Sequence, residues 1–328
     1  GHFKNFTASY PKSENHDQAL YEWAWAERGL ENDKEAVRLY EELLAKHPKS
    51  PLVVKVQSEL AELNLDSGAQ DQVIAKLTET MKSISDESLK EPIRIQLASA
   101  HFKKGDHEVA AVMFEELLND YPKSKLRASM LFQAGESRLR LKETVAARDH
   151  VALAVKLPGI EPALAETLTM RLGETQSLTS QYKEAVNTYR QFLNNFRESQ
   201  WLRNAQFGLG YALEKNDKPQ EAVNEYVKLL TDPKKVDLWT VRGRFQTGEC
   251  YFNMQQYEQA IAEFVKIEIE FKKYPSWQAK SVLEIGRVLL AQGKRDEASQ
   301  RFRDVINRYT KEKAAIVARQ YLDELRSQ

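Results

Sequence analysis

The sequence of 328 residues lacks most features that mark an enzyme or a membrane protein. No run of about 18 apolar residues occurs, so we expect no transmembrane helix. The six histidines are scattered without metal-binding spacing, and no glycine-rich loop follows a strand-like segment to hold phosphate. No serine or cysteine lies in a recognisable nucleophile motif. We therefore predict a protein that is not an enzyme and that has no cofactor and no metal site.

Cysteine and net charge are also scarce. The single cysteine, Cys250, can form no internal disulfide, and its position beside Gly248 in a predicted helix favours a buried, inert thiol. Lysine and arginine together number 48, as do aspartate and glutamate, so the formal net charge is zero. A neutral chain lacks the basic field that non-specific nucleic-acid binding requires, and we expect no nucleic-acid partner.

What the sequence does contain is a small residue that returns every 37 or 38 positions. This column consists of Ala36, Val73, Ala110, Ala147, Ala185, Ala222, Ala260 and Ala298. A second small column lies twelve residues earlier in each unit: Ala24, Ala61, Ala98, Gly135, Gly173, Gly210, Gly248 and Gly286. A mostly aromatic column, from Tyr40 to Phe302, lies four residues after the first. A period of this length along the whole chain indicates a stacked repeat array.

Each unit is predicted to be a pair of amphipathic helices. Turn formers such as Gly105-Asp106 and Gly293-Lys294 lie between the two small columns and separate the helices. We expect the two small columns to face each other, which would let the helix backbones approach closely. Several units end in a Tyr-Pro-Lys-Ser motif or a close relative, in which proline ends the second helix and serine is placed to cap the next one.

A further column just before each first helix contains three tryptophans, Trp201, Trp239 and Trp277, at intervals of 38 residues. These could form an aromatic ladder for a ligand. The same column is leucine in most of the first half of the chain, for example at Leu52 and Leu126. An apolar residue before a helix start commonly packs against the adjoining turn or the previous unit. We therefore interpret these side chains as wedges between repeats.

These columns resemble the tetratricopeptide repeat (TPR) family, as Leu209-Gly210 with Ala222 and Tyr226 illustrates. The resemblance covers essentially the whole chain. It implies an all-α fold, a right-handed superhelical solenoid of about eight TPR-like helical hairpins plus a C-terminal capping helix. We expect residues 1–16 to be the tail of a truncated preceding repeat, 17–312 to form the eight repeats, and 313–328 to be the capping helix.

The long period and the Tyr-Pro-x-Ser endings are similar to one branch of the family in particular. That branch contains bacterial envelope proteins related to the outer-membrane barrel-assembly lipoprotein and the Tol-Pal-associated periplasmic coordinator. The similarity implies a periplasmic or envelope-associated location, with a cytoplasmic location as the alternative. The half hairpin at the start predicts that a signal peptide, a lipid anchor or further repeats precede Gly1.

In this family the first helix of each unit lines a concave groove. By register, the expected groove pairs are Phe132/Glu136, Met170/Glu174, Phe207/Tyr211 and Phe245/Glu249. Apolar anchors beside carboxylates suit a protein or peptide segment with apolar and basic side chains. Some of these aromatic residues could instead complete the packing between neighbouring first helices.

The function that the resemblance implies is a non-enzymatic protein–protein interaction scaffold, which binds a peptide or helix in its groove within a bacterial cell-envelope complex. The sequence leaves two alternatives open. One is a cytosolic assembly or regulatory adaptor, and the other is a TPR accessory domain of a larger enzyme or secretion machine.

Overall fold

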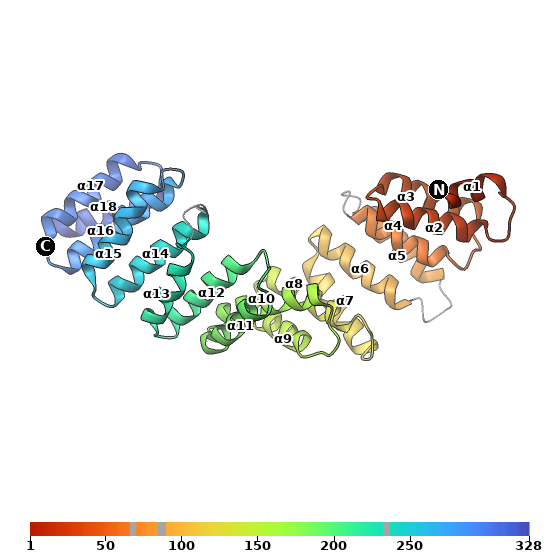
Figure 1. Cartoon of the computed structure of the whole chain (residues 1–328), viewed down its shortest axis with the longest axis horizontal. Helices are drawn as coiled ribbons and strands as arrows, with labels where there is room; N and C mark the ends of the chain where they lie inside the picture. Colours follow the sequence, from red (N-terminus) through yellow and green to blue (C-terminus); the bar gives the residue numbers. More distant parts are fainter. Residues whose placement is uncertain (66–69, 84–89, 232–236, 328) are drawn as a thin grey trace. The chain divides into compact units, whose positions relative to one another are not determined.

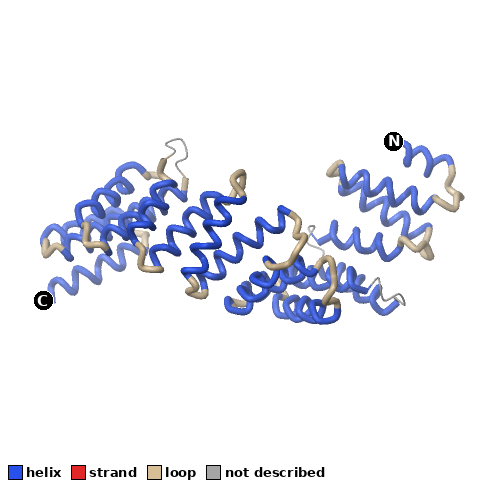
Figure 2. Tube along the Cα trace, turned by 60° about the horizontal axis from the view of Figure 1, so that its bottom comes forward, coloured by secondary structure: helices blue, strands red, loops and turns tan. Residues whose placement is uncertain are grey.

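The computed structural model describes residues 1–65, 70–83, 90–231 and 237–327. These residues form helices and no strand (Figure 2). The helices in chain order are α1 His2–Ser9, α2 His16–Gly29, α3 Asp33–Lys46, α4 Val53–Leu65, α5 Gln70–Ser83, α6 Lys90–Lys104, α7 His107–Asp120, α8 Arg127–Arg140, α9 Thr144–Val155, α10 Pro162–Leu178, α11 Tyr182–Asn195, α12 Leu202–Lys215, α13 Pro219–Lys228, α14 Leu238–Asn253, α15 Tyr257–Glu270, α16 Pro275–Ala291, α17 Arg295–Arg308 and α18 Lys313–Ser327.

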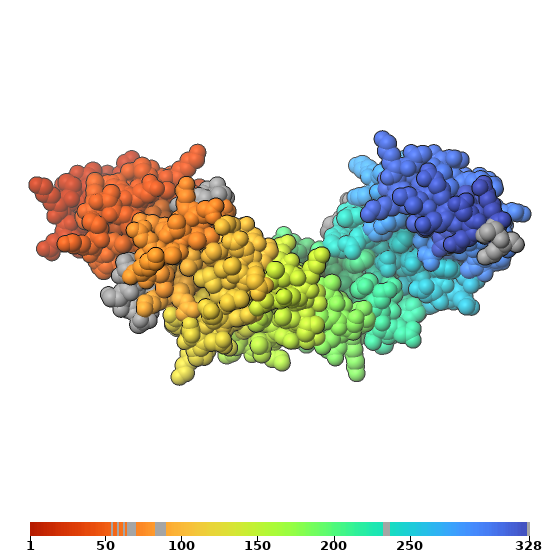
Figure 3. All heavy atoms as spheres, turned by 180° about the vertical axis from the view of Figure 1, so that it is seen from behind, coloured from red at the N-terminus to blue at the C-terminus, as the bar shows by residue number. Residues whose placement is uncertain are grey.

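The chain divides into two compact units, Gly1–Ile160 and Glu161–Gln328. Within each unit, helices that follow one another in the sequence pack as neighbours, from α2/α3 to α8/α9 in the first and from α10/α11 to α16/α17 in the second (Figure 1). Side chains fill the space between these neighbours (Figure 3). The predicted helical-repeat fold is therefore confirmed.

The recurring columns form the core of each hairpin. Ala222 and Ala260, in the second helices of their hairpins, are fully buried with 0% of their surface exposed. The aromatic side chains one turn later, Tyr226 and Phe264, are also fully buried. The period of the sequence thus coincides with the period of the core.

The glycines of the earlier small column make room for these aromatic rings. A Cβ atom added at Gly248 would lie 2.6 Å from Cε1 of Phe264, and one at Gly286 would lie 2.5 Å from Cε1 of Phe302. The three atoms nearest to each of these added Cβ atoms belong to the ring, whereas at Gly135 the carbonyl oxygen of the recurring Ala147 would lie 3.2 Å from the added Cβ. At Gly248 and Gly286 the missing side chain therefore admits the ring of the second helix.

The turn inside each hairpin uses the left-handed backbone region five residues before the recurring alanine. Gly105 and Gly293 have φ values of 98° and 77° at this position. In five other hairpins a residue with a side chain adopts φ between 57° and 65°: Glu31, Lys142, Ser180, Asp217 and Gln255. The equivalent Gly68 lies outside the described residues. One backbone geometry therefore ends the first helix of these hairpins.

The serine of the unit-ending motif stabilises the turn before the next first helix. The Oγ atom of Ser124 accepts a hydrogen bond from the backbone N–H of Leu126 at 2.9 Å, and Ser50 does the same for Leu52 at 3.1 Å. The Ser50 hydroxyl also donates a short hydrogen bond to Asp17 at the start of the preceding first helix. The predicted cap thus acts on the turn ahead of the helix and also joins that turn to the first helix of the preceding hairpin.

Candidate interaction surface

The first helices of the four hairpins in the Glu161–Gln328 unit form one row. Helix α12 contacts both α10 and α14, and α14 contacts α16. Six of the eight predicted groove residues lie on these helices: Met170, Glu174, Phe207, Tyr211, Phe245 and Glu249. We call the side of the unit formed by α10, α12, α14 and α16 the first-helix face.

Two of the tryptophans pack across the boundaries between repeats. The ring of Trp239 lies 5.6 Å from that of Phe207 in the preceding first helix, centroid to centroid. One repeat later, the ring of Trp277 lies 5.2 Å from that of Phe245 in an edge-on arrangement. Both distances are typical of favourable aromatic pairs. The interpretation of these tryptophans as wedges between repeats is confirmed.

The two phenylalanines belong partly to the core and partly to the surface. Phe207 lies 5.4 Å from Tyr226, and Phe245 lies 5.4 Å from Phe264, in each case a ring of the second helix of its own hairpin. Both phenylalanines nevertheless remain half-buried. The two readings that the sequence left open, groove lining and inter-helix packing, are thus compatible at these positions.

A small pocket lies between α10 and α12. Its volume is about 160 Å³, and its lining consists of Thr167, Met170, Arg171, Glu174, Trp201 and Asn204. Met170 is 8% exposed. The structure therefore brings the predicted pair Met170/Glu174 together with the tryptophan of the next repeat. A pocket of this size suits one side chain rather than a whole small molecule.

The predicted groove carboxylates offer less negative charge than the sequence indicated. Glu174 forms an ion pair with Arg171 on the same helix. Burial raises the pKa of Glu249, and burial together with Glu249 raises the pKa of Glu284 on the next first helix. Two carboxyl groups that are close together and buried resist ionising at the same time, and the one cation that Glu284 contacts, Arg287, can balance a single negative charge of the pair.

Tyr211 is the remaining predicted residue in this unit. Its ring makes an edge-on contact with Tyr182 of α11 at 6.4 Å, and the Nζ atom of Lys215 lies 5.5 Å from its centroid. Tyr211 is half-buried on α12. It lies one helical turn after Phe207, as the register predicts.

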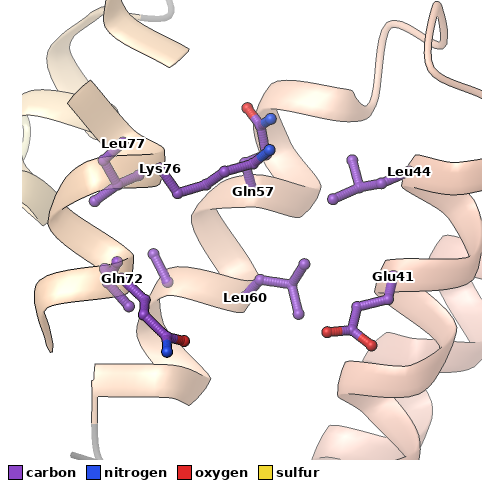
Figure 4. A pocket seen from close by; sticks show the side chains of 9 residues that line it. Glu41, Leu44, Gln57, Leu60, Gln72, Lys76 and Leu77 are labelled. Carbon is purple, nitrogen blue, oxygen red and sulfur yellow. The ribbon is translucent and has the colours of Figure 1, made fainter. Parts of the chain in front are cut away.

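The predicted pair in the other unit has a different environment. Phe132 on α8 is half-buried, while Glu136 is 8% exposed. A carboxylate this buried is poorly accessible to a partner. A cavity of about 290 Å³ in the same unit lies between α3, α4 and α5, and Leu44, Leu60 and Leu77 help to line it (Figure 4). None of the predicted site residues lines this cavity.

One residue of the first-helix face was not predicted from the sequence. The guanidinium carbon of Arg242 lies 4.2 Å from the ring centroid of Phe207 and 4.6 Å from that of Trp239. Arg242 is half-buried, and burial lowers its pKa. The signal in the sequence was its spacing: Arg242 follows Trp239 by three residues, as Lys280 follows Trp277.

The described residues contain no group of three or more histidine, cysteine, aspartate or glutamate side chains placed to hold a metal ion. Over the same residues, no helix is both long and apolar enough to cross a membrane. Cys250 is fully buried, as predicted, and burial raises the pKa of its thiol. A thiol in this environment is a weak nucleophile.

Comparison with known families identifies the repeats. The family model described as "Tetratricopeptide repeat" matches residues 18–50, 95–124, 168–199, 243–268 and 281–311. These five segments come from both compact units. No curated protein matches the chain significantly.

Several solved structures have a similar fold. The C-terminal part of a TPR repeat-containing protein from Cytophaga hutchinsonii has a TM-score of 0.59 at 13% identity, covering 80% of this chain and 98% of that chain. The apo form of RapI has a TM-score of 0.56 at 16% identity, covering 77% of this chain and 76% of that chain. A tetratricopeptide repeat protein from Parabacteroides merdae has a TM-score of 0.48 at 16% identity, covering 77% of this chain and 92% of that chain. The TM-scores of the first two structures support a shared fold, and identities this low support nothing finer.

Proposed function

We propose that this chain, which belongs to the tetratricopeptide repeat family, is a non-enzymatic scaffold that binds a segment of a partner protein on its first-helix face. The observation that carries the proposal is the row of half-buried aromatic side chains on neighbouring first helices, at Phe207, Tyr211 and Phe245. Aromatic residues held rigidly by their neighbours are the usual anchors of protein interfaces.

The pocket beside Met170 supplies a recess in the face for one side chain of the partner. An apolar side chain of the partner could enter between Met170 and Trp201, while Thr167 and Asn204 provide hydrogen-bonding groups at the same pocket. An extended or helical segment would place further side chains along the row of first helices.

The charge preference of the partner remains a prediction. The sequence favours basic side chains because Glu174 and Glu249 lie one turn from apolar anchors. The ion pair of Glu174 with Arg171 and the raised pKa of Glu249 weaken that argument. We therefore retain an apolar anchor as the main requirement of the site.

A bacterial envelope location is likewise a proposal from the sequence alone, resting on the Tyr-Pro-x-Ser endings. The full-length gene tests it directly. A signal peptide or a lipid-attachment cysteine at its start would support the envelope, and a start without either would support the cytosolic adaptor.

Two matched double variants test the binding face. Thr167→Arg with Asn204→Arg places two long cationic side chains at the pocket. Asn187→Arg with Asn224→Arg makes the same change of charge at exposed positions on the second helices α11 and α13. Each variant is used as bait beside the wild type in a quantitative affinity capture from native lysate.

We expect the first double variant to lose a protein that the wild type and the second double variant retain. Circular dichroism of all three proteins establishes that the helices are intact. Equal capture by all three, or loss in the second variant alone, would contradict the proposed face.

A further inference from the structure

The arginines on the first-helix face differ in how their charge is compensated. Helices α10, α12, α14 and α16 carry five arginines, all of them half-buried, and four of these form ion pairs with carboxylates. The pairs are Arg171–Glu174, Arg203–Asp237, Arg244–Glu263 and Arg287–Glu284. Burying a cation without such a partner costs free energy, so pairing is the rule for arginines in this environment.

Arg242 is the fifth, and it has no carboxylate within ion-pair distance among the described residues. Its guanidinium lies over Phe207 and Trp239 instead. Burial lowers the pKa of Arg242, and the one ionisable group that opposes this shift is the phenol of Tyr226. Within the described part of the chain, the positive charge of Arg242 is therefore held by aromatic faces rather than by an anion.

The position of the guanidinium over the two rings determines what Arg242 can still bind. A guanidinium whose charge is held by aromatic rings, and not by a carboxylate of the chain, has N–H groups left for a ligand, and two of these groups match the two oxygens of a carboxylate. A single guanidinium balances the single charge of a carboxylate better than the nearly double charge of a phosphate.

The next repeat has an equivalent arrangement. The Nζ atom of Lys280 lies 4.5 Å from the ring centroid of Trp277, which itself packs on Phe245. Lys280 is exposed and occupies the register position of Arg242, 38 residues later. Two successive repeats thus present a cation beside a phenylalanine–tryptophan pair.

The spacing of the two cations follows from helix packing. Helices α14 and α16 are in contact, and the axes of contacting helices lie roughly 8–10 Å apart. Three residues of extended chain span about 10 Å. In an extended segment of the polyproline II type, which has three residues per turn, acidic side chains three positions apart lie on one side and about 9 Å apart, so they would meet the two cations together.

We propose that Arg242 and Lys280 bind two side-chain carboxylates, about three residues apart, in an extended polyproline II-type segment of the partner protein. This inference rests on the proposed function, because it names the chemistry of the segment that occupies the first-helix face, and it replaces the preference for basic side chains that the sequence indicated with a preference for acidic ones. The acidic residues would lie beside the apolar anchors, with their carboxylates next to the rings of Trp239 and Trp277.

A library of random short peptides tests the inference. The peptides are displayed on phage with their carboxyl ends fused to the coat protein, so that enriched negative charge comes from side chains and not from a chain terminus. Selection uses the whole protein as bait, in the wild-type form and as Arg242→Gln and Arg242→Lys. Arg190→Gln is the matched control, because Arg190 is an exposed arginine on α11 with a surface ion pair to Glu221.

We expect wild type and Arg190→Gln to enrich peptides with aspartate or glutamate at positions three apart. One enriched peptide, synthesised with blocked ends, should bind about tenfold more weakly to Arg242→Gln. Arg242→Lys should recover part of the affinity, because it keeps the charge and loses the bidentate geometry. Replacing the peptide carboxylate by its amide should then add little to the loss in Arg242→Gln.

Two other outcomes are informative. Enrichment of apolar peptides without acidic residues, bound equally by Arg242→Gln, would overturn the inference and leave the scaffold function standing. If no peptide were enriched by any form, both the inference and the proposed peptide-binding face would fail.

Discussion

At the scale of single residues, the hairpins depend on places where a side chain is absent or unusual. Gly248 and Gly286 each make room for a buried aromatic ring of their own hairpin. Gly208 on α12 makes room for the ring of Tyr189, which belongs to the previous hairpin. A Cβ atom at Gly208 would lie 2.7 Å from Cε1 of Tyr189 in the previous hairpin. Its Gly-Leu-Gly segment, which superficially resembles a nucleotide-binding motif, therefore has a packing reason.

Replacing Gly248 by alanine should destabilise the protein by about 1–3 kcal/mol, because the added Cβ would displace the fully buried ring of Phe264. Gly29→Ala is the control, since no atom would lie within 4 Å of its Cβ. That change should be neutral or stabilise by up to about 1 kcal/mol, because it reduces the freedom of the unfolded chain. Urea denaturation measures both values, and equal effects at the two sites would contradict the packing role of the glycine column.

His16 is the unusual member of the column before each first helix, where Leu52 and Leu126 stand in later repeats. Its side chain is 1% exposed, and its Nδ1 atom lies 2.8 Å from Nε2 of His47. Burial, His47 and Lys46 lower the pKa of His16, against the opposing effects of a Thr7 backbone hydrogen bond and Glu42.

A histidine with a lowered pKa in the folded state makes stability depend on pH. The unfolded chain takes up the proton first, near pH 6.5. The contribution of His16 to the free energy of unfolding should therefore be constant above about pH 6.5 and should decrease as the pH drops below that value. His16→Leu, which restores the residue of the later repeats, should reduce the resulting loss. Denaturation of both proteins at about pH 7 and about pH 5 measures this loss of free energy of unfolding. An equal loss in the variant would show that groups other than His16 cause it.

At the scale of elements, the hairpins share one turn geometry, whereas the residue type at the turn differs from hairpin to hairpin. The turn was only partly predictable, because glycine marks the left-handed position at Gly105 and Gly293 but not at Lys142, Ser180 or Gln255. At those three positions the packing of two helices imposes the backbone angle in spite of the side chain. The repeat register, rather than local composition, is the signal that locates this turn.

Exchanging residues at this turn position should change stability in opposite directions. Gln255→Gly should stabilise by about 1 kcal/mol, because a left-handed backbone costs roughly 1–2 kcal/mol for a residue with a Cβ atom. Gly293→Gln, the reverse exchange in another hairpin, should destabilise by a similar amount. Thermal unfolding of the two variants measures the difference, and shifts of the same sign would contradict the assignment.

At the scale of the whole molecule, the periodic columns predicted the repeat fold because each column is buried against its neighbours in the same way. The charges of the first-helix face were harder to predict. Glu249 and Glu284 interact across a repeat boundary, and Arg242 reaches a ring on the preceding first helix. Such contacts depend on the rotation of adjacent helices and on side-chain rotamers, which the repeat period does not determine. The aromatic row was predictable, whereas its electrostatic environment was not.

The most direct test of the proposed binding face is site-specific photocrosslinking with the partner that the affinity capture identifies. A photoreactive residue replaces Asn204 on α12 in one protein and Asn224 on α13 in another, so that the first-helix face is compared with the second helices of the same unit. We predict a crosslink to one continuous segment of the partner from position 204 and none from position 224. A crosslink from position 224, or no crosslink from position 204 to a partner that remains bound, would contradict binding on the first-helix face.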